Sequence, residues 1–246
     1  MEQFEIFADL IPDGGTLIYF EEDPELKKIA DQINPLVTPV PYGAPEYEVN
    51  DGISVVNYEG KSYPLQVFGK HNLTNLEGAR EVCRLLGITA DEFYTAAQSF
   101  TGAGRRMELV KKTASQVIYR DFAHSPSKLK ATVAAAKEQF PERKIVACME
   151  LHTFSSLSEN FLEQYSGTMQ EADVPVVYFN PSTIAHKKLP PVSTNQVKTA
   201  FADERIRVFT DPVSLTDFIR ENFTGPSVLL MMSSGTFDGI DVSGLI

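Results

Sequence analysis

In the second half of the chain, short apolar runs alternate with stretches whose apolar positions recur every three or four residues. The short runs predict strands, and the amphipathic stretches predict helices. We expect strands at 107–111, 116–121, 144–149, 174–179, 205–210 and 227–232. We expect helices at about 126–140, 157–172, 194–202 and 212–223. This alternation predicts right-handed βαβ units and a parallel sheet with both faces covered by helices.

The first hundred residues have a more mixed pattern. They predict helices at 1–10 and 24–33 and a strand at 16–20. Residues 36–68 contain three or four short β runs, of which Ile53–Tyr58 and Tyr63–Phe68 are joined by the turn Glu59-Gly60-Lys61.

Two helices are expected after this β-rich segment. The first has one apolar stripe and ends at Gly87; the stripe consists of Leu73, Leu76, Ala79, Cys83 and Leu86. The second helix opens with Thr89-Ala-Asp-Glu92, a capping box in which two side chains satisfy free backbone amides.

The pattern changes near Phe100–Met107, so we expect two domains, at 1–103 and 104–246. The fold class is α/β. The second domain is expected to be a doubly wound, mostly parallel, Rossmann-like sheet, and the first to combine short β strands with two helices. In such parallel sheets, ligands bind beyond the carboxyl ends of the strands.

Composition indicates a globular protein with an acidic surface. Of 246 residues, 22 are Lys or Arg and 33 are Asp or Glu, which gives a net charge of −11. This charge disfavours nucleic acid as a partner, because phosphate backbones are bound by clustered cations. We see no signal sequence, no apolar run long enough for a membrane, and no metal-type spacing of the two cysteines. We therefore expect a cytoplasmic protein.

The first candidate for chemistry is "YRDFAHSP", residues 119–126. Ser125 is expected at the N-cap of a helix that begins at Pro126. Asp121 then lies at the carboxyl end of a strand, where its carboxylate could accept hydrogen bonds from a ribose, with His124 before the helix. The alternative is that Asp121 and Ser125 only cap the loop and that His124 is exposed.

The second candidate is "GKHNLTNLEGAR", residues 69–80, in which His71 and Asn75 share a helical face. Asparagine is unfavourable inside helices, and an amide offers both the donor and the acceptor that an adenine edge requires. The alternative is that Asn72 caps the helix and that Asn75 is solvated.

The third candidate is "FTGAGRRMELV", residues 100–110. It lacks the Gly-Lys-Ser/Thr of a phosphate-binding P-loop, and a strand rather than a helix follows. We interpret it as a flexible hinge whose arginine could reach a phosphate, since the arginine fork binds oxyanions with two hydrogen bonds. The alternative is a solvated linker.

Two weaker candidates follow later strands. The loop in "MELHTFSSLSENF" offers four side chains to a polar substrate, namely Glu150, His152, Thr153 and Ser155. In "LLMMSSGTFDGID", a structural junction between strand and turn is the better interpretation of Ser233, Ser234 and Gly235.

Together these segments resemble the Mur ligases, the ATP-dependent amide-forming enzymes of bacterial peptidoglycan synthesis. Phe68 through Asn75 is similar to the family's Gly-x-His-Asn-x-x-Asn helix, and Phe100 through Glu108 to its Phe-x-Gly-x-x-Arg-Arg-x-Glu hinge. Asp121 through Pro126 resembles Asp-Tyr/Phe-Ala/Gly-His-x-Pro. The ending "MMSSGTFDGI" is most similar to the murein peptide ligase branch, and the UDP-N-acetylmuramate–L-alanine ligase branch is next.

The resemblance implies a role for each matching residue. His71, Asn72 and Asn75 would line the adenine side of an ATP site, and Asp121 would bind the ribose. Arg106 would reach the γ-phosphate, and His124 would lie beside the reacting centre. The reaction would join a peptide or amino acid to UDP-N-acetylmuramate through an acyl phosphate. Magnesium would assist, and the 150–155 loop would bind the acceptor.

The sequence also departs from the family pattern. The UDP-binding domain, the Gly-x-Gly-Lys-Thr/Ser loop and most magnesium ligands are absent, and Arg120 replaces a frequent second acid. The resemblance therefore implies a partial ATPase domain at 1–103, an acceptor-binding domain at 104–246, and a chain that is inactive alone. Residues 1–100 would expose an apolar face through which the chain could self-associate.

Three alternatives remain open at this point. One is a non-catalytic module that binds a nucleotide or a muropeptide. The others are a different Mur-type ligase that adds L-alanine, and a folylpolyglutamate synthase-like enzyme.

Overall fold

The alternating pattern of the second half forms one six-stranded sheet in the computed structural model, which describes residues 1–50 and 52–245. Its strands are β6 Glu108–Lys112, β7 Gln116–Asp121, β8 Lys144–Glu150, β9 Val174–Tyr178, β10 Arg207–Phe209 and β11 Ser227–Met232. They lie in the order β10-β9-β8-β11-β7-β6. Only β6 pairs antiparallel with its neighbour, so the expected mostly parallel sheet is confirmed.

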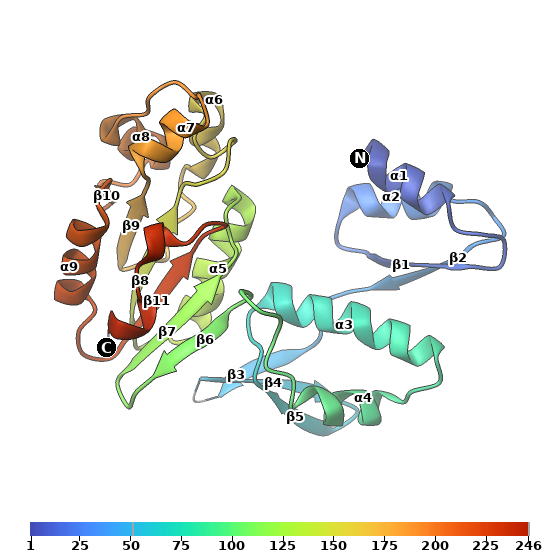
Figure 1. The fold of residues 1–246 in the computed structure, drawn as a ribbon. Coiled ribbons are helices and arrows are strands. Elements are labelled where there is room, and N and C mark those ends of the chain that lie inside the picture. Colours follow the sequence, from blue (N-terminus) through green and yellow to red (C-terminus); the bar gives the residue numbers. More distant parts are fainter. Residues whose placement is uncertain (51, 246) are drawn as a thin grey trace. The chain divides into compact units, whose positions relative to one another are not determined.

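Helices connect these strands and cover the sheet (Figure 1). They are α5 Pro126–Gln139, α6 Glu159–Leu162, α7 Pro181–His186, α8 Thr194–Phe201 and α9 Pro212–Asn222, with the 3-10 turns η1 Glu163–Tyr165, η2 Phe237–Gly239 and η3 Val242–Leu245. The expected helix at 157–172 is wrong. The chain turns extended at Ser166 and takes a positive φ at Gly167, so the helix stops after α6 and η1. Helix α7 was not predicted.

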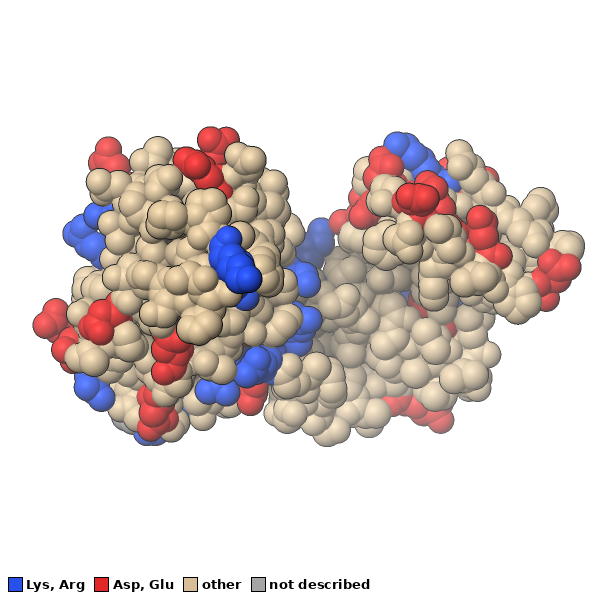
Figure 2. Space-filling view, turned by 45° about the horizontal axis from the view of Figure 1, so that its top comes forward, with Lys and Arg blue, Asp and Glu red and all other residues tan. Residues whose placement is uncertain are grey.

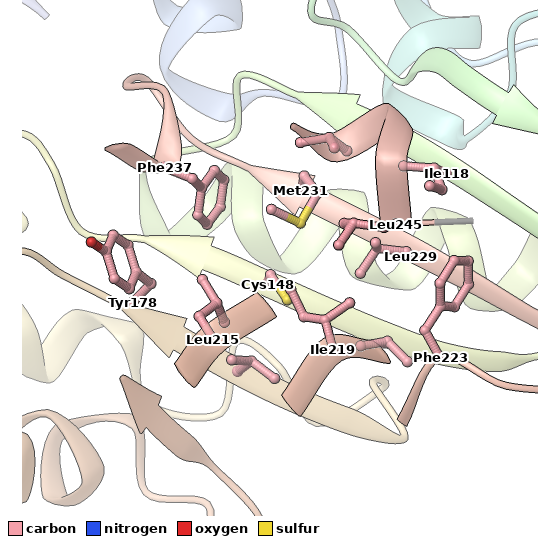
Figure 3. Close-up of a cluster of buried hydrophobic side chains, with 13 residues drawn as sticks. Ile118, Cys148, Tyr178, Leu215, Ile219, Phe223, Leu229, Met231, Phe237 and Leu245 are labelled. Carbon is pink, nitrogen blue, oxygen red and sulfur yellow. The ribbon is translucent and has the colours of Figure 1, made fainter. Parts of the chain in front are cut away.

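The core on one face of the sheet is closed by α9 and the C-terminal turns. Side chains from four strands meet Leu215 and Ile219 of α9 and Phe237, Val242 and Leu245 of η2 and η3 (Figure 3). Strand β11 lies in the middle of the sheet, between β7 and β8, and all six of its residues are buried. Removing this apolar surface from water is the main stabilising contribution to the domain.

The chain divides into two compact units, Met1–Phe100 and Thr101–Ile246. The six-stranded sheet belongs to the second unit. The elements of the first unit are α1 Glu2–Asp9, β1 Thr16–Phe20, α2 Pro24–Gln32, β2 Thr38–Tyr42, β3 Tyr47–Asn50, β4 Ile53–Tyr58, β5 Lys61–Leu65, α3 Lys70–Leu85 and α4 Ala90–Ala97. Strands β1 and β2 pair in parallel, and β3, β4 and β5 form an antiparallel sheet. The assignment of this unit to an ATPase domain stays a prediction.

The hairpin between β4 and β5 differs from the expected one. Strand β5 begins at Lys61, which pairs with Tyr58, so only Glu59 and Gly60 form the turn. Both have positive φ, 48° and 77°, as the tight two-residue turns of twisted hairpins require.

The stripe predicted for α3 is only partly correct. Leu73 and Leu76 are buried, whereas Leu86 is 76% exposed. Glu77 and Glu81 take the remaining inward positions, because Arg80 pairs with both at 2.8 Å. A paired charge can be buried where an unpaired one cannot, and the apolar end of the helix is left exposed. The capping box of α4 is confirmed, since the backbone N–H of Glu92 donates to Thr89 Oγ1 and that of Thr89 to Glu92 Oε2.

Within residues 1–50 and 52–245, no helix is both long enough and apolar enough to cross a bilayer.

We expect Leu215→Ala to lower the free energy of unfolding of the larger unit by about 2–5 kcal/mol, because it leaves a cavity in the cluster of Figure 3. Val213→Ala on the same helix is the control: Val213 is 66% exposed, and we expect a change within about 0.5 kcal/mol. Urea unfolding followed by circular dichroism measures both. Equal losses would mean that α9 does not close the core.

Candidate functional site

Three adjacent parallel strands bring several of the predicted residues to the carboxyl end of the six-stranded sheet. β7, β11 and β8 end at Asp121, Met232 and Glu150, and the loops after them carry the candidate side chains. The register, however, assigns the two acids to opposite faces. Asp121 pairs with Met232, whereas Glu150 continues the face of Cys148 and Met231. The structure therefore forms two separate clusters at this edge.

The Asp121 carboxylate is buried and held by three donors of the chain itself. Oδ2 accepts the Met107 N–H at 2.7 Å, and Oδ1 accepts the Ala123 N–H at 2.7 Å and the Thr132 hydroxyl at 3.3 Å. Only 5% of the surface of Asp121 is exposed to solvent. Asp121 thus joins the hinge, its own loop and helix α5. Its proposed contact with a ribose stays a prediction.

The two residues predicted to be catalytic lie against one aromatic ring. The Arg106 guanidinium is 5.2 Å from the centre of the Phe122 ring, within the range of a cation–π contact. The His124 ring meets the same ring edge-on, with centroids 5.0 Å apart and planes at 77°. Phe122 is therefore a contact that a permanent cation and an imidazole have in common.

The backbone around His124 fixes which of its ring nitrogens can react. Nδ1 lies 2.8 Å from the Phe122 carbonyl oxygen, which can only accept, so Nδ1 carries the proton. In the neutral ring, Nε2 then has a free lone pair and can accept a proton or a hydrogen bond. The Tyr165 hydroxyl donates to the His124 carbonyl, and burial raises the pKa of Tyr165, so that hydroxyl remains a donor.

Helix α5 begins as expected, with Ser125 at the N-cap and Pro126 in the first turn. No hydrogen bond from the helix to the Ser125 side chain is formed. The loop after β7 is instead ordered by the hydrogen bonds of the Asp121 carboxylate. The alternative interpretation, in which Asp121 and Ser125 cap the loop, therefore applies to Asp121.

Glu150, His152 and Ser233 form the second cluster. The Glu150 carboxylate is buried and accepts hydrogen bonds from the Ser233 hydroxyl and, at 2.9 Å, from the Phe237 N–H. His152 Nδ1 lies 3.6 Å from Glu150 Oε1, and its side chain is 37% exposed. The predicted acceptor-loop residues Glu150 and His152 are thus brought together, with the imidazole facing outward.

Ser233 and Gly235 are members of this cluster that the sequence interpretation treated as structural. A Cβ on Gly235 would lie 2.8 Å from Glu150 Oε2 and 2.8 Å from His152 Cγ, so only glycine allows this approach. Its N–H donates to Ser233 Oγ at 2.6 Å. The sequence does contain a signal for their place at the site: β11, like β8, is an apolar strand followed directly by polar residues.

Two other members of the 150–155 loop form local hydrogen bonds. Thr153 Oγ1 accepts the Ser156 N–H at 3.1 Å, and Thr153 and Ser155 hydroxyls lie 3.2 Å apart. These bonds shape the turn that follows His152. Substrate contacts from Thr153 and Ser155 stay a prediction.

His71, Asn72 and Asn75 belong to helix α3 in the other unit. Asn72 Nδ2 donates to the Phe68 carbonyl at 2.9 Å, so the side chain does not cap the free amides of the helix as the alternative supposed. The residue at the N-cap is Gly69, with φ 86°. Asn75 is exposed and His71 half-buried. Their role toward an adenine stays a prediction.

Buried groups near the second cluster hold their protons. Burial, and then the hydrogen bond to Asp238, raise the pKa of Tyr178, which makes its hydroxyl a donor at neutral pH. Burial alone raises the pKa of the Cys148 thiol, so it is a core side chain and not a nucleophile.

No group of three or more His, Cys, Asp or Glu side chains within the described part of the chain could hold a metal ion. The use of magnesium, expected from the resemblance, stays a prediction.

The model of the family described as Mur ligase, glutamate ligase domain matches residues 105–235, more than half of the chain. The chain belongs to the Mur ligase family. The match covers Arg106, Asp121, His124, Glu150 and Ser233, and thus both clusters.

Two UDP-N-acetylmuramate–L-alanine ligases have sequences similar to this chain. The UDP-N-acetylmuramate–L-alanine ligase of Chlorobaculum parvum is 29% identical over 250 residues, which cover 95% of this chain and 53% of the relative. That of Desulfitobacterium hafniense is 29% identical over 187 residues, 71% of this chain and 40% of the relative. The chain thus spans about half the length of these relatives.

Solved structures show that the fold is that of Mur ligases. The murein peptide ligase of Psychrobacter arcticus has a TM-score of 0.61 at 19% identity, over 98% of this chain and 52% of that one. A MurF ligase of Thermotoga maritima in complex with ADP has a TM-score of 0.71 at 16% identity, over 96% and 54%.

We expect Asp121→Asn to lower the free energy of unfolding by about 1–3 kcal/mol, because the amide turns a donor toward a backbone N–H and leaves it unpaired. Hydrogen exchange at Met107 and Ala123 should speed up. The matched control is Asp217→Asn, on an exposed position of α9. Unchanged exchange at Met107 would show that the carboxylate does not hold the hinge.

We expect Gly235→Ala to displace the His152 side chain, since the added methyl group would overlap its ring. The nuclear Overhauser contacts between His152 and Gly235 in the native protein should disappear in this variant. Gly104→Ala is the control, because no atom lies within 4 Å of a Cβ there. A His152 ring with native chemical shifts would contradict the packing described here.

Proposed function

We propose that this chain forms part of an ATP-dependent ligase that joins an amino acid or peptide to UDP-N-acetylmuramate. The observation that carries the proposal is the cluster of Arg106 and His124 on the Phe122 ring, inside the region matched by the Mur ligase family. The names of the relatives support an acceptor of the L-alanine type. A peptide acceptor is supported by the resemblance of the C-terminal motif to the murein peptide ligase branch.

The chemistry of the first cluster fits the phosphates of ATP. Arg106 is exposed, and its guanidinium has no ion pair among residues 1–50 and 52–245, so its donors are available to an oxyanion. His124 offers Nε2, which can accept a hydrogen bond or a proton. ATP would supply the phosphoryl group that activates a carboxyl group, while Arg106 holds the charge that develops.

The second cluster would serve the incoming amine. Glu150 is fixed by Ser233 and Phe237, and it keeps the His152 ring at the edge of the sheet. We propose that His152 contacts the acceptor, with Thr153 and Ser155 beside it, and that Asp121 positions the nucleotide site through the hinge. Bringing the reacting groups together is a large part of such catalysis.

The remaining parts of the proposal concern partners and location. ATP with magnesium, UDP-N-acetylmuramate and an amine acceptor are the proposed ligands, and the cytoplasm is the proposed location. Large apolar side chains are exposed in the unit Met1–Phe100, among them Phe4, Phe7, Leu10 and Leu86, which supports the proposed self-association.

The test joins the first half of the Chlorobaculum parvum relative to this chain and measures phosphate release from ATP. We expect release that requires both UDP-N-acetylmuramate and an acceptor, either L-alanine or L-Ala-γ-D-Glu-meso-diaminopimelate. Arg106→Ala should lower kcat by about 10²–10³-fold, because the Arg106 guanidinium would no longer stabilise the developing charge.

The control is Arg220→Ala, an exposed arginine of α9, which should leave kcat within about twofold. If no acceptor stimulates release, the ligase proposal fails. Tight binding of ATP or a muropeptide to the chain, without turnover, would then identify it as a binding module.

A further inference from the structure

A pocket of about 190 Å³ lies in the unit Thr101–Ile246, beside β7 and β11. Its walls are Arg105 of the hinge, Arg120 of β7, Met231 of β11 and parts of the segment 233–242. This volume is several times the roughly 30 Å³ that a water molecule occupies in the liquid. The pocket can therefore hold a small organic group.

The register places the pocket on one particular face of the sheet. Arg120 pairs with Met231, whose side chain belongs to the apolar cluster under α9 (Figure 3). Asp121, the next residue, points to the other face, toward Thr132 of α5. Phe122 and Arg106 are not among the residues that line the pocket.

Both arginines of the pocket keep their guanidinium groups unpaired. Among the described residues, neither group has a hydrogen bond or an ion pair, and no acidic side chain lines the pocket. Glu108 lies opposite Arg120 in the register, but its Oε2 accepts the backbone N–H of Arg105 at 2.9 Å. The chain is acidic overall, and Figure 2 shows acidic and basic side chains spread over its surface, so two unpaired cations at one pocket stand out.

The backbone holds Arg105 in a conformation that a non-glycine residue rarely adopts. Its φ is 56°, and its N–H and C=O are bound by Glu108 Oε2 and the Phe122 N–H, the latter at 2.7 Å. Such strain persists only where neighbouring contacts impose it, and it is concentrated at functional sites. Here those contacts fix the point from which the Arg105 side chain reaches the pocket.

The other groups around the pocket define its ligand. Ser233 Oγ is already used, because it donates to Glu150 and accepts from Gly235. Thr236 is exposed, and its hydroxyl can donate. Met231, Phe237 and Ile240 supply apolar surface. Two guanidinium groups match the double negative charge of a phosphate better than the single charge of a carboxylate.

We propose that the pocket between Arg105 and Arg120 binds the phosphate group of a small phosphorylated molecule. Each guanidinium contributes paired donors, and Thr236 adds a hydroxyl. The pocket shares Ser233, Gly235 and Phe237 with the second cluster, but this proposal depends on Arg105 and Arg120, to which the ligase proposal assigns no role. The ligand is either free phosphate or a phosphate monoester whose organic part contacts Phe237 and Ile240.

Titration calorimetry of the whole chain with inorganic phosphate and with phenyl phosphate tests the proposal. We expect one site for each, with phenyl phosphate tighter if the apolar wall contributes. Arg120→Gln, which keeps most of the side chain's length, and Arg105→Ala should each weaken binding about tenfold or more. Arg220→Ala is the matched control and should bind as the native chain does.

Four outcomes would overturn the assignment. They are no binding at millimolar phosphate, native affinity in Arg120→Gln, tighter binding of acetate than of phosphate, and loss of binding in Arg106→Ala but not in Arg105→Ala. The last would place the phosphate at the Phe122 ring. Circular dichroism of each variant confirms its fold, and if Arg105→Ala unfolds, Arg120→Gln and Thr236→Val decide.

Discussion

The hydrogen bonds of the Asp121 carboxylate are the constraint on which the first cluster depends. A buried carboxylate is strongly disfavoured unless its oxygens are satisfied, and here two backbone amides and a hydroxyl satisfy them. One amide belongs to Met107, directly after Arg106, and the other to Ala123, directly before His124. A single side chain thereby sets the position of both residues proposed to act on ATP.

The second cluster uses the same physical solution on the opposite face. Glu150 is buried at the end of β8, and a hydroxyl and a backbone amide from the segment after β11 satisfy it. In both clusters the acid comes at the end of a parallel strand, and at least two of its donors come from other segments of the chain. The carboxylates thus order the loops at the edge where ligands of α/β sheets bind.

Much of the fold could be predicted from the sequence, because an apolar run flanked by polar residues indicates a buried strand whatever its tertiary contacts are. The bounds of β7 and β11 agree with the expected 116–121 and 227–232. The helix expected at 157–172 failed because Leu162, Tyr165 and Met169 have helical spacing but are buried by successive short turns. The apolar stripe predicted for α3 is wrong at Ala79 and Leu86, which are exposed. Glu77 and Glu81 are buried in their place, and this depends on their pairing with Arg80 in the folded chain.

The sequence predicted the members of the first cluster but not its geometry. Motif order pointed to Arg106, Asp121 and His124, while two of the three donors to Asp121 lie 14 and 11 residues away and have no signature of their own. Ser233 was expected at a junction between strand and turn, but its hydrogen bond to Glu150 could not be predicted because the two residues are 83 positions apart in the chain. The Arg105–Arg120 pocket likewise needs the pairing of β7 with β11, which only the folded chain reveals.

The central place of β11 has a consequence for synthesis of the chain. β7 and β8 do not pair with each other; each pairs with β11. Until residues 227–232 have left the ribosome, the sheet can exist only as two separate pieces, β6 with β7 and β8 with β9 and β10. Their apolar edges must stay protected during translation, so a nascent chain that stalls shortly before Ser227 would be a natural client for chaperones.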